Sequence, residues 1–441
     1  MGGGLLQLVA YGAQDAYLSG NPQITFWKGL YKRHTNFAME PFRINFNGQA
    51  TWGSKQTAIV GRHADLLFST YVEVQMPVTY SASATTAKWN HGVNSGMGRY
   101  PLGFNLIEYI ELDIGGQIVD KLYSEFMYLW SELTYTNQQI YKLNSMLTNE
   151  KYSDSTLQFT APVGCTTGQG RSSLPNTLYI PLSFFFTKNP GAALPLIALQ
   201  YHEVKINIQW NDQTMIAGSL NDIKTKSLQS PVSAAVYIDY IYLDTEERRR
   251  FAQQSHEYLI EQVQYNEDVG VCSPSQRIDL TFNHPVKELL WVVQPTCYRN
   301  CKVPVKELRA SVTDRLLPFC YDLDASNKAP VYEQFIQING QDRLERRYGD
   351  YFNKVQPFQH HTGIAPGVGV YSYSFAVKPE EHQPSGTCNF SRIDTATIVM
   401  TLDGSVTVSD DSSDTWDVRV YAVNYNVLRI MSGMGGLAFS N

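Results

Sequence analysis

Two series of strand-like segments follow one another along this chain of 441 residues. In these segments polar and apolar residues alternate with a period of two, and β-branched and aromatic residues are frequent, as in strands that bury one face. The segments of the first half are FRINFNG (42–48), LLFSTYVEVQMP (66–77), LIEYIELDIGGQIV (106–119), TLYIPLSFFF (177–186), HEVKINIQW (202–210) and AAVYIDYIYL (234–243). Those of the second half are RIDLTF (277–282), KELLWVVQP (287–295), YEQFIQINGQD (332–342), VYSYSFAV (370–377), TATIVMTL (395–402) and WDVRVYAVNYNVL (416–428). The pattern predicts an all-β protein.

The two series also agree in their order. The similar pairs are VEVQMP with WVVQP (72–77, 291–295), ELDIGGQ with FIQINGQ (111–117, 335–341), LSFFFTKNP with YSFAVKP (182–190, 373–379), and VYIDYIYL with VYAVNYNVL (236–243, 420–428). One such pair would mean little, but an ordered set predicts an internal duplication. Because a single core stops growing at about 250–300 residues, two β domains are expected.

A short, densely charged segment, TEERRRFAQQSHEYLIEQV (245–263), separates the two series. Asp244 and Glu247 fit a helix capping box, and Glu246 and Arg250 have the i, i+4 spacing of a helical ion pair. The segment therefore predicts a capped helical turn that bridges two β domains, with its HEYLIEQV part already extended.

A second helix is predicted at DKLYSEFMYLWSEL (120–133). Its apolar residues recur on one side, at Leu122, Phe126, Leu129, Trp130 and Leu133. We expect this helix to cover an open sheet edge.

The composition limits the classes of partner. The formal net charge is −6, so the chain lacks the basic face that a general nucleic-acid footprint requires. Charged residues make up 17% of the chain, below the usual value of about 25%, and there are 28 tyrosines. Much of the surface is therefore expected to be covered by other molecules.

The cysteines are too sparse for a disulfide framework or a zinc site, since the only close pair is a C-x3-C. They are expected to be free thiols in a reducing compartment: Cys165, Cys272, Cys297, Cys301, Cys320 and Cys388. The first residues carry no positive charge before Lys28, and no apolar run reaches the ~18 residues of a membrane span. A cytosolic protein is expected.

No catalytic, cofactor-binding or metal site is predicted. A two-cupin metalloenzyme would need a His-x-His pair on one strand face, but His360 and His361 are adjacent and would point to opposite faces. No nucleophile elbow, P-loop or dinucleotide fingerprint occurs. A jelly-roll carbohydrate-binding protein would need an exposed aromatic platform, for which only Trp89 and Tyr100 are candidates.

Three long irregular segments, residues 81–103, 148–176 and 403–415, are expected to be functional loops on an outer face. We expect segment 148–176 to reach over a neighbouring subunit. Both chain ends are rich in glycine, so they are expected to hold no regular element alone and to serve docking.

Several long stretches resemble one family throughout the chain. They are LVAYGAQDAYLSGNPQITFWK (8–28), PGAALPLIALQYHEVKI (190–206), YIDYIYLDTEERRRFAQQSHEYLIEQ (237–262), SYSFAVKPEEHQPSGTCNFSRID (372–394) and YAVNYNVLRIMSGMGGLAFSN (421–441). They are similar to the major capsid proteins of nucleocytoplasmic large DNA viruses, and most of all to those of algal viruses.

The resemblance implies a double jelly roll, two tandem eight-stranded sandwiches. It implies an N-terminal arm at 1–30, a first jelly roll at 31–243, a connector at 244–268 and a second jelly roll at 269–441. It further implies a structural, non-enzymatic protein that forms homotrimers and tiles an icosahedral virion shell assembled in the host cytoplasm. The expected partners are neighbouring capsomers, minor capsid and penton proteins and, through the arm, the inner viral membrane side; no cofactor and no direct nucleic-acid binding are expected.

Overall fold

The computed structural model describes residues 2–76, 86–87, 101–148, 176–216, 227–228, 230–271, 273–299, 318–321, 329–403 and 415–439. The chain divides into two compact units, an N-terminal unit of residues 1–37 and a body of residues 38–441. Each unit is described by itself. The predicted loops 81–103, 148–176 and 403–415 fall largely outside the described residues.

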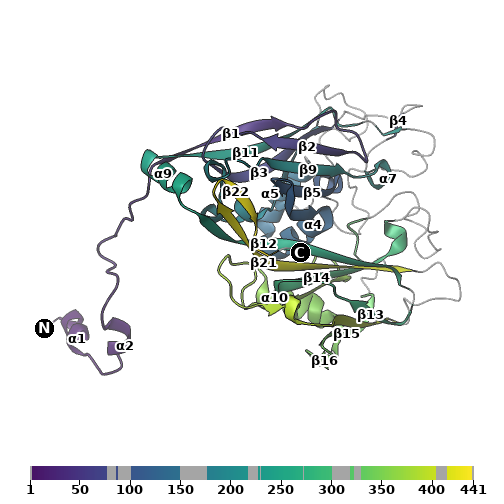
Figure 1. Cartoon of the computed structure of the whole chain (residues 1–441). Helices are drawn as coiled ribbons and strands as arrows, with labels where there is room; N and C mark the ends of the chain where they lie inside the picture. The colour runs from purple at the N-terminus through teal and green to yellow at the C-terminus, as the bar shows by residue number, and fades with distance from the viewer. Residues whose placement is uncertain are drawn as a thin grey trace, which may run out of the picture. The chain divides into compact units, whose positions relative to one another are not determined.

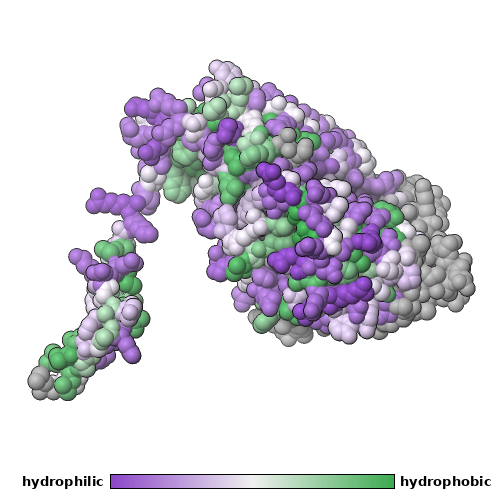
Figure 2. Space-filling view, turned by 60° about the horizontal axis from the view of Figure 1, so that its bottom comes forward, coloured by the Kyte–Doolittle hydropathy of each residue, from purple (hydrophilic) through white to green (hydrophobic). Residues whose placement is uncertain are grey.

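The N-terminal unit contains two short helices, α1 (Gly3–Val9) and α2 (Ala16–Ser19). Neither helix has a buried residue, and among residues 2–37 all but Asp15 are exposed. Large apolar side chains such as Trp27 and Tyr31 are 94% and 97% exposed, and Figure 2 shows hydrophobic residues along this unit. The expectation that the glycine-rich start holds no regular element was wrong, since α1 forms there.

The first half of the body is a sandwich of two antiparallel sheets. One sheet has the order β1-β11-β3-β7, with the short β8 beside β3: β1 (Phe37–Asn45), β11 (Ser233–Leu243), β3 (Leu66–Met76), β7 (Asn176–Pro181) and β8 (Leu194–Pro195). The other has the order β2-β9-β5-β6: β2 (Lys55–Val60), β9 (Val204–Trp210), β5 (Ile107–Ile114) and β6 (Gln117–Tyr123). In β9 buried and half-buried residues alternate strictly, so one face of this sheet forms the core.

The second half repeats this arrangement (Figure 1). One sheet has the order β12-β21-β14-β18, with β19 on β14 and β22 on β21: β12 (His256–Val271), β21 (Trp416–Met431), β14 (Pro285–Pro295), β18 (Val370–Ser374), β19 (Cys388–Asn389) and β22 (Met434–Leu437). The other has the order β13-β20-β15-β16, with β17 on β15: β13 (Ser275–Asp279), β20 (Ala396–Leu402), β15 (Val331–Ile338), β16 (Gln341–Asp342) and β17 (Arg347–Tyr348). The fold is the expected double jelly roll.

The predicted duplication is confirmed for three of the four strand pairs. β3 and β14 hold the same place in their sheets, as do β5 and β15, and β11 and β21. The pair of aromatic strands was right only in part, because TLYIPLSFFF leaves β7 after Pro181 and enters helix α6 (Phe185–Lys188). Its three phenylalanines are all buried, which an alternating strand facing solvent on one side does not allow.

The connector contains helix α9 (Thr245–Gln253), capped by the Asp244 carboxylate, which accepts a hydrogen bond from Thr245 N. Arg248 forms an ion pair with Asp65 at 3.0 Å, and Arg249 lies 3.9 Å from Glu246, so the predicted Glu246–Arg250 pair is replaced by an i, i+3 pair. Residues 256–268 of the predicted connector lie in β12, which pairs with β21 along nearly its whole length. The extended HEYLIEQV part is therefore confirmed.

The second predicted helix begins later than expected, because residues 120–123 belong to β6 and pair with β5. Helix α4 (Ser124–Thr134) follows, and every residue from Ser124 to Leu133 is buried. Figure 1 shows it between the strands of the first roll and β12 and β21 of the second. The expectation that it covers an open sheet edge was wrong, because both jelly rolls enclose it.

The remaining short elements connect the strands. They are α3 (Leu102–Asn105), α5 (Asn137–Thr148), α7 (Gln213–Ile216), α10 (Gln356–His360), the 3-10 turns η1 (Pro190–Ala192), η2 (Leu196–Ala198), η3 (Thr296–Tyr298) and η6 (Phe390–Arg392), the π-helical turn η5 (Tyr351–Val355), and the parallel pair β4 (Thr86–Ala87) and β10 (Ser227–Leu228). At the C-terminus a turn at Ser432 and Gly433, both with positive φ, returns the chain as β22, which is held by its pairing with β21 and does not stand alone. No helix among the described residues is long and apolar enough to cross a membrane.

Each roll has its own core, and the larger core continues into the junction between the rolls. In both cores a tryptophan indole donates to a glutamine side chain, Trp210 to Gln56 at 2.8 Å and Trp291 to Gln334 at 3.0 Å. Leu290 and Val292 on the outer face of β14 belong to the larger core, whereas Trp291 between them faces the smaller core. The two rolls are thus joined by a continuous apolar layer, where each fully buried large side chain contributes about 1.5–3 kcal/mol.

Candidate functional site

A deeply buried carboxylate lies at the junction between the two rolls. Glu125 stands in the first turn of α4 and receives two parallel hydrogen bonds from Arg419 on β21, Nε to Oε2 at 2.6 Å and NH2 to Oε1 at 2.9 Å. The Arg419 side chain is 0% exposed and that of Glu125 is 3% exposed. This bidentate pair fixes α4 of the first roll to the last long strand of the second.

Further donors surround the same carboxylate. The hydroxyl of Tyr421 donates to Glu125 at 2.7 Å and that of Tyr321 at 3.2 Å, while Arg299 lies at 3.4 Å. Burial alone would raise the pKa of Glu125, but Arg419 and Arg299 outweigh burial and lower it to about 2. Glu125 therefore keeps its charge far below neutral pH.

A second ion cluster joins the rolls beside the first. Glu261 on β12 forms ion pairs with Lys287 on β14 and with Lys188 at the end of α6, the latter at 2.9 Å. Burial lowers the pKa of Lys287 and opposes the raising effect of Glu261, while the two lysines hold the pKa of Glu261 at about 2 against burial. Lys188 comes from the first roll and Glu261 from the second, so this cluster is a second polar link.

The third buried group is the side chain of His361, which follows α10. Its Nε2 lies 2.5 Å from Glu288 and its Nδ1 lies 3.2 Å from Glu380. Burial lowers the pKa of His361, but the two carboxylates outweigh burial and raise it to about 9. The imidazole packs edge-on against Trp130 of α4, at 6.2 Å between ring centroids, so this cluster also borders the junction.

A glycine allows the same loop to approach α4. Gly363 N donates to the carbonyl of Leu133 at 2.7 Å, which satisfies a carbonyl at the C-terminal end of the helix. A Cβ at Gly363 would lie 2.1 Å from the carbonyl oxygen of Glu132. Only glycine therefore fits at this contact.

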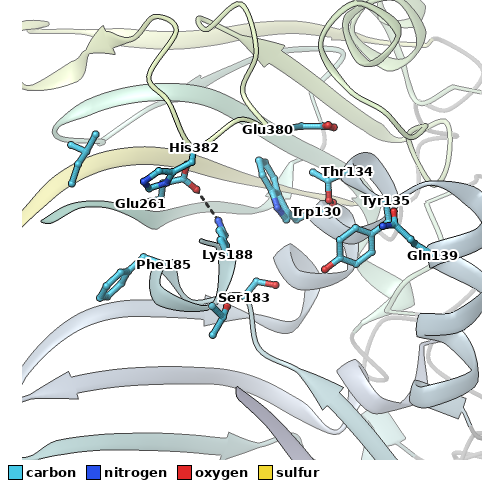
Figure 3. Close-up of a pocket in the computed structure, with 12 residues that line it drawn as sticks. Trp130, Thr134, Tyr135, Gln139, Ser183, Phe185, Lys188, Glu261, Glu380 and His382 are labelled. Carbon is cyan, nitrogen blue, oxygen red and sulfur yellow. Dashed lines mark hydrogen bonds and ion pairs between the residues drawn. The ribbon is translucent and has the colours of Figure 1, made fainter. Parts of the chain in front are cut away.

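A pocket lies at the junction, and Figure 3 shows the side chains that line it. Its volume is 460 Å³. It is lined by Trp130, Thr134, Tyr135, Gln139, Ser183, Phe185, Thr187, Lys188, Leu259, Glu261, Glu380 and His382. Its most prominent charges already neutralise each other, because Lys188 pairs with Glu261 on the pocket wall and lies 5.1 Å from the ring centroid of Trp130. The arrangement is that of a structural seam between two rolls.

Sequence reasoning named no catalytic or metal residue, and it missed all three buried clusters. The adjacent His360 and His361 lie at the end of helix α10 and just after it instead of on a strand, and of the two only His361 has a fully buried side chain. Among the described residues, no group of three or more His, Cys, Asp or Glu side chains is placed to hold a metal ion. Cys320 and Cys388 are free thiols.

Known proteins share this fold and sequence over the whole chain. A family model described as large eukaryotic DNA virus major capsid protein matches residues 247–436, and one described as major capsid protein N-terminus matches residues 25–244. The major capsid proteins of Pyramimonas orientalis virus and Paramecium bursaria Chlorella virus 1 are 45% and 39% identical to the chain, with 100% of both chains covered in each case. A solved structure of PBCV-1 VP54, fitted into a reconstruction of the virophage Sputnik, has a TM-score of 0.75 at 34% identity and covers 95% of this chain and 100% of that chain. The chain therefore belongs to the family of major capsid proteins of large eukaryotic DNA viruses.

Proposed function

We propose that three copies of this chain form a pseudohexagonal capsomer, and that such capsomers tile the icosahedral shell of a large double-stranded DNA virus. The observation that carries the proposal is the repeated sheet order, because two equivalent rolls per chain around a threefold axis give six comparable units in a ring. A ring of six comparable units has a nearly hexagonal outline, and such outlines pack edge to edge across a flat facet. One gene product then suffices for most of the shell.

The oligomeric state is the first test. Native mass spectrometry of the purified protein is expected to show a species near three times 49.8 kDa, about 149 kDa, because each chain exposes aromatic surface that a monomer rarely leaves in water. A dominant monomer or dimer at micromolar concentration, in protein whose unfolding is cooperative, would contradict the trimer.

We also propose that the N-terminal unit links the capsomer to the inner side of the shell, where minor capsid proteins, penton proteins and a viral membrane would be its neighbours. Its exposed tryptophan, tyrosine and leucine side chains support this proposal, since they have no core of their own to enter. The net charge of −6 gives no support for direct contact with the viral DNA. Assembly in the host cytoplasm is part of the same proposal.

Deleting residues 2–20 tests this role of the N-terminal unit. The trimer should still form and its unfolding temperature should stay within about 2 °C, because none of these residues contributes to the core of the body. Shell assembly, followed by electron microscopy of co-expressed capsid components, should fall to background. Normal shells from the truncated protein would refute the proposed link.

The role we propose is structural and not catalytic. The charged side chains of the three buried clusters form ion pairs with one another, as in a structural junction. Among the residues of these clusters none is placed as an activated nucleophile or general base. The relatives named above are capsid proteins.

We propose that the boundary between the first roll and the connector lies where the sequence predicts it. The first roll then ends at residue 243, the connector starts at 244, and the second roll extends to the C-terminus. The two family models support the division, since one ends at residue 244 and the other begins at 247. Limited proteolysis within α9, whose residues are largely exposed, would test whether this segment is the link between the rolls.

A further inference from the structure

The duplication allows the surfaces of the two rolls to be compared residue by residue. Tyr71 pairs with Tyr237 in the first roll, and Leu290 pairs with Tyr421 in the second, with a Val-Tyr dipeptide at the same place in β11 and β21. The outer face of β3 and β11 is therefore equivalent to the face of β14 and β21 on which α4 lies. In the second roll this face is covered, since Tyr421 is 1% exposed.

The covering segment also has an equivalent. Tyr123 pairs with Tyr109 on β5, and Tyr348 pairs with Glu333 on β15; Tyr109 and Glu333 stand at the same distance before the turn that ends their strands. Tyr348 is thus the counterpart of Tyr123. Asp350, two residues after Tyr348, is then the counterpart of Glu125, and η5 and α10 follow where α4 follows in the first roll.

Inside the chain the two halves of this contact meet. The ring of Tyr123 lies 4.5 Å from that of Tyr265 and 6.1 Å from that of Tyr421, and Phe126 lies 5.8 Å from Tyr421. Glu125 completes the contact through Arg419. The end of β6 and helix α4, both from the first roll, thus pack on the outer face of β14 and β21 in the second roll.

The counterparts of these two surfaces are the outer face of β3 and β11 on the first roll and the segment from Tyr348 to α10 on the second, and both carry half-buried or exposed side chains. On the first roll, Tyr71 stacks on Tyr237 at 5.2 Å and lies 6.0 Å from Tyr179, and Glu73 stands beside them on the same face; we call these four residues the tyrosine face. They are half-buried or exposed in the single chain.

The helix surface is the matching part of the second roll. It consists of Tyr348, Asp350, Lys354 and Phe358. Tyr348 is 61% exposed and Phe358 is 87% exposed, and Lys354 reaches Asp350 at 2.8 Å with both side chains more than half exposed.

We propose that the helix surface of one copy docks on the tyrosine face of the next copy, in a head-to-tail contact equivalent to the one that α4 makes within the chain. This inference rests on the proposed trimer and names the surfaces that close it. A contact between two different surfaces of identical chains repeats around an axis and closes into a ring when the rotation permits. Each chain then contributes one internal and one external version of the same junction.

The charges on the two surfaces favour docking of a second roll on a first roll. Ala235 in the first roll takes the place of Arg419, and Glu73 takes the place of Val292. The tyrosine face therefore offers an acid where the second roll offers a base, and the helix surface supplies Lys354 to meet it. Asp350, the counterpart of Glu125, is already paired with Lys354 on the helix surface, whereas α4 carries no cation, so the helix surface suits Glu73 better than a second copy of α4 would.

Alanine variants test the two surfaces separately. Phe358→Ala and Tyr237→Ala should each raise the dissociation constant of the trimer about 10–100-fold, measured by dilution in mass photometry or native mass spectrometry. Ile59→Ala is the matched control: Ile59 is also an exposed apolar strand residue, on β2 of the first roll, and its removal should leave the trimer unchanged. Thermal unfolding of each variant checks that the fold is intact.

Charge reversal tests the pairing without removing aromatic side chains. Glu73→Lys and Lys354→Glu should each weaken the trimer about 10-fold, and the double variant should return to within about 3-fold of the unaltered protein. No recovery would overturn the proposed charge pairing, and unchanged trimers in every variant would overturn the docking while the trimer itself stood. A monomeric unaltered protein would overturn the proposed trimer instead.

Discussion

Replacing Glu125 by alanine is expected to lower the free energy of unfolding of the body by about 3–5 kcal/mol, because the change removes the bidentate partner of the fully buried Arg419 guanidinium and leaves only Asp417, 4.0 Å away, as a counter-charge. The hydroxyls of Tyr421 and Tyr321 lose their acceptor at the same time. Urea unfolding of the variant, followed by tryptophan fluorescence, measures the loss.

Two variants make this result specific. Glu246→Ala removes a glutamate whose side chain is 83% exposed and whose partner Arg249 lies at 3.9 Å, so its cost should stay below about 1 kcal/mol. Glu125→Met combined with Arg419→Met should recover part of the loss, since buried apolar groups of similar volume often replace an ion pair without penalty. A loss below about 1 kcal/mol for Glu125→Ala would show that water reaches the pair.

The stability of the second roll should fall as the pH rises through about 9. His361 has a folded-state pKa of about 9, above its ordinary value near 6.5, so the protonated form is favoured by folding. Its contribution is fully present below about pH 6.5 and is lost progressively as the pH rises through the folded pKa. The size of the effect is on the order of 3 kcal/mol, since a tenfold change in proton affinity corresponds to about 1.4 kcal/mol.

Unfolding midpoints between pH 6 and pH 10 measure this dependence. The control is a double variant, His361→Gln with Glu288→Gln, which removes both members of the closest pair. The difference in unfolding free energy between the unaltered protein and this variant should decline across the window. A difference that stays constant from pH 6 to pH 10 would mean that folding does not raise the pKa of His361.

The strands were predictable where one face of a strand meets solvent or a uniform apolar core. β9 and β20 show strict alternation, and both are expected from their sequences. Residues 256–263 of β12 were predicted to be extended, but they were assigned to the connector because the segment is densely charged. The charge of Glu261 is matched by Lys188 and Lys287 from other elements. Strand β2 was missed because KQTAIV is short and lacks aromatic residues.

Helix α4 shows a different limit. Its apolar spacing predicted a helix in the right region, but an amphipathic pattern indicates one buried face, and this helix is buried all round. Its polar residues, Glu125 above all, enter the protein because their partners come from distant parts of the chain. The buried clusters had no signal in the sequence, since Glu288 and His361 are separated by 73 positions and neither stands in a recognisable motif.

The distance along the chain between Glu125 and Arg419 also has a consequence during synthesis. Arg419 is the 294th residue that the ribosome adds after Glu125. At about 5–20 residues per second this interval lasts on the order of 15–60 s, during which the side of α4 that faces the second roll lacks its partner strand. The nascent chain would therefore expose apolar and charged side chains of α4 for much of its translation. A host chaperone that shields α4 until β21 emerges would raise the yield of assembly-competent subunits.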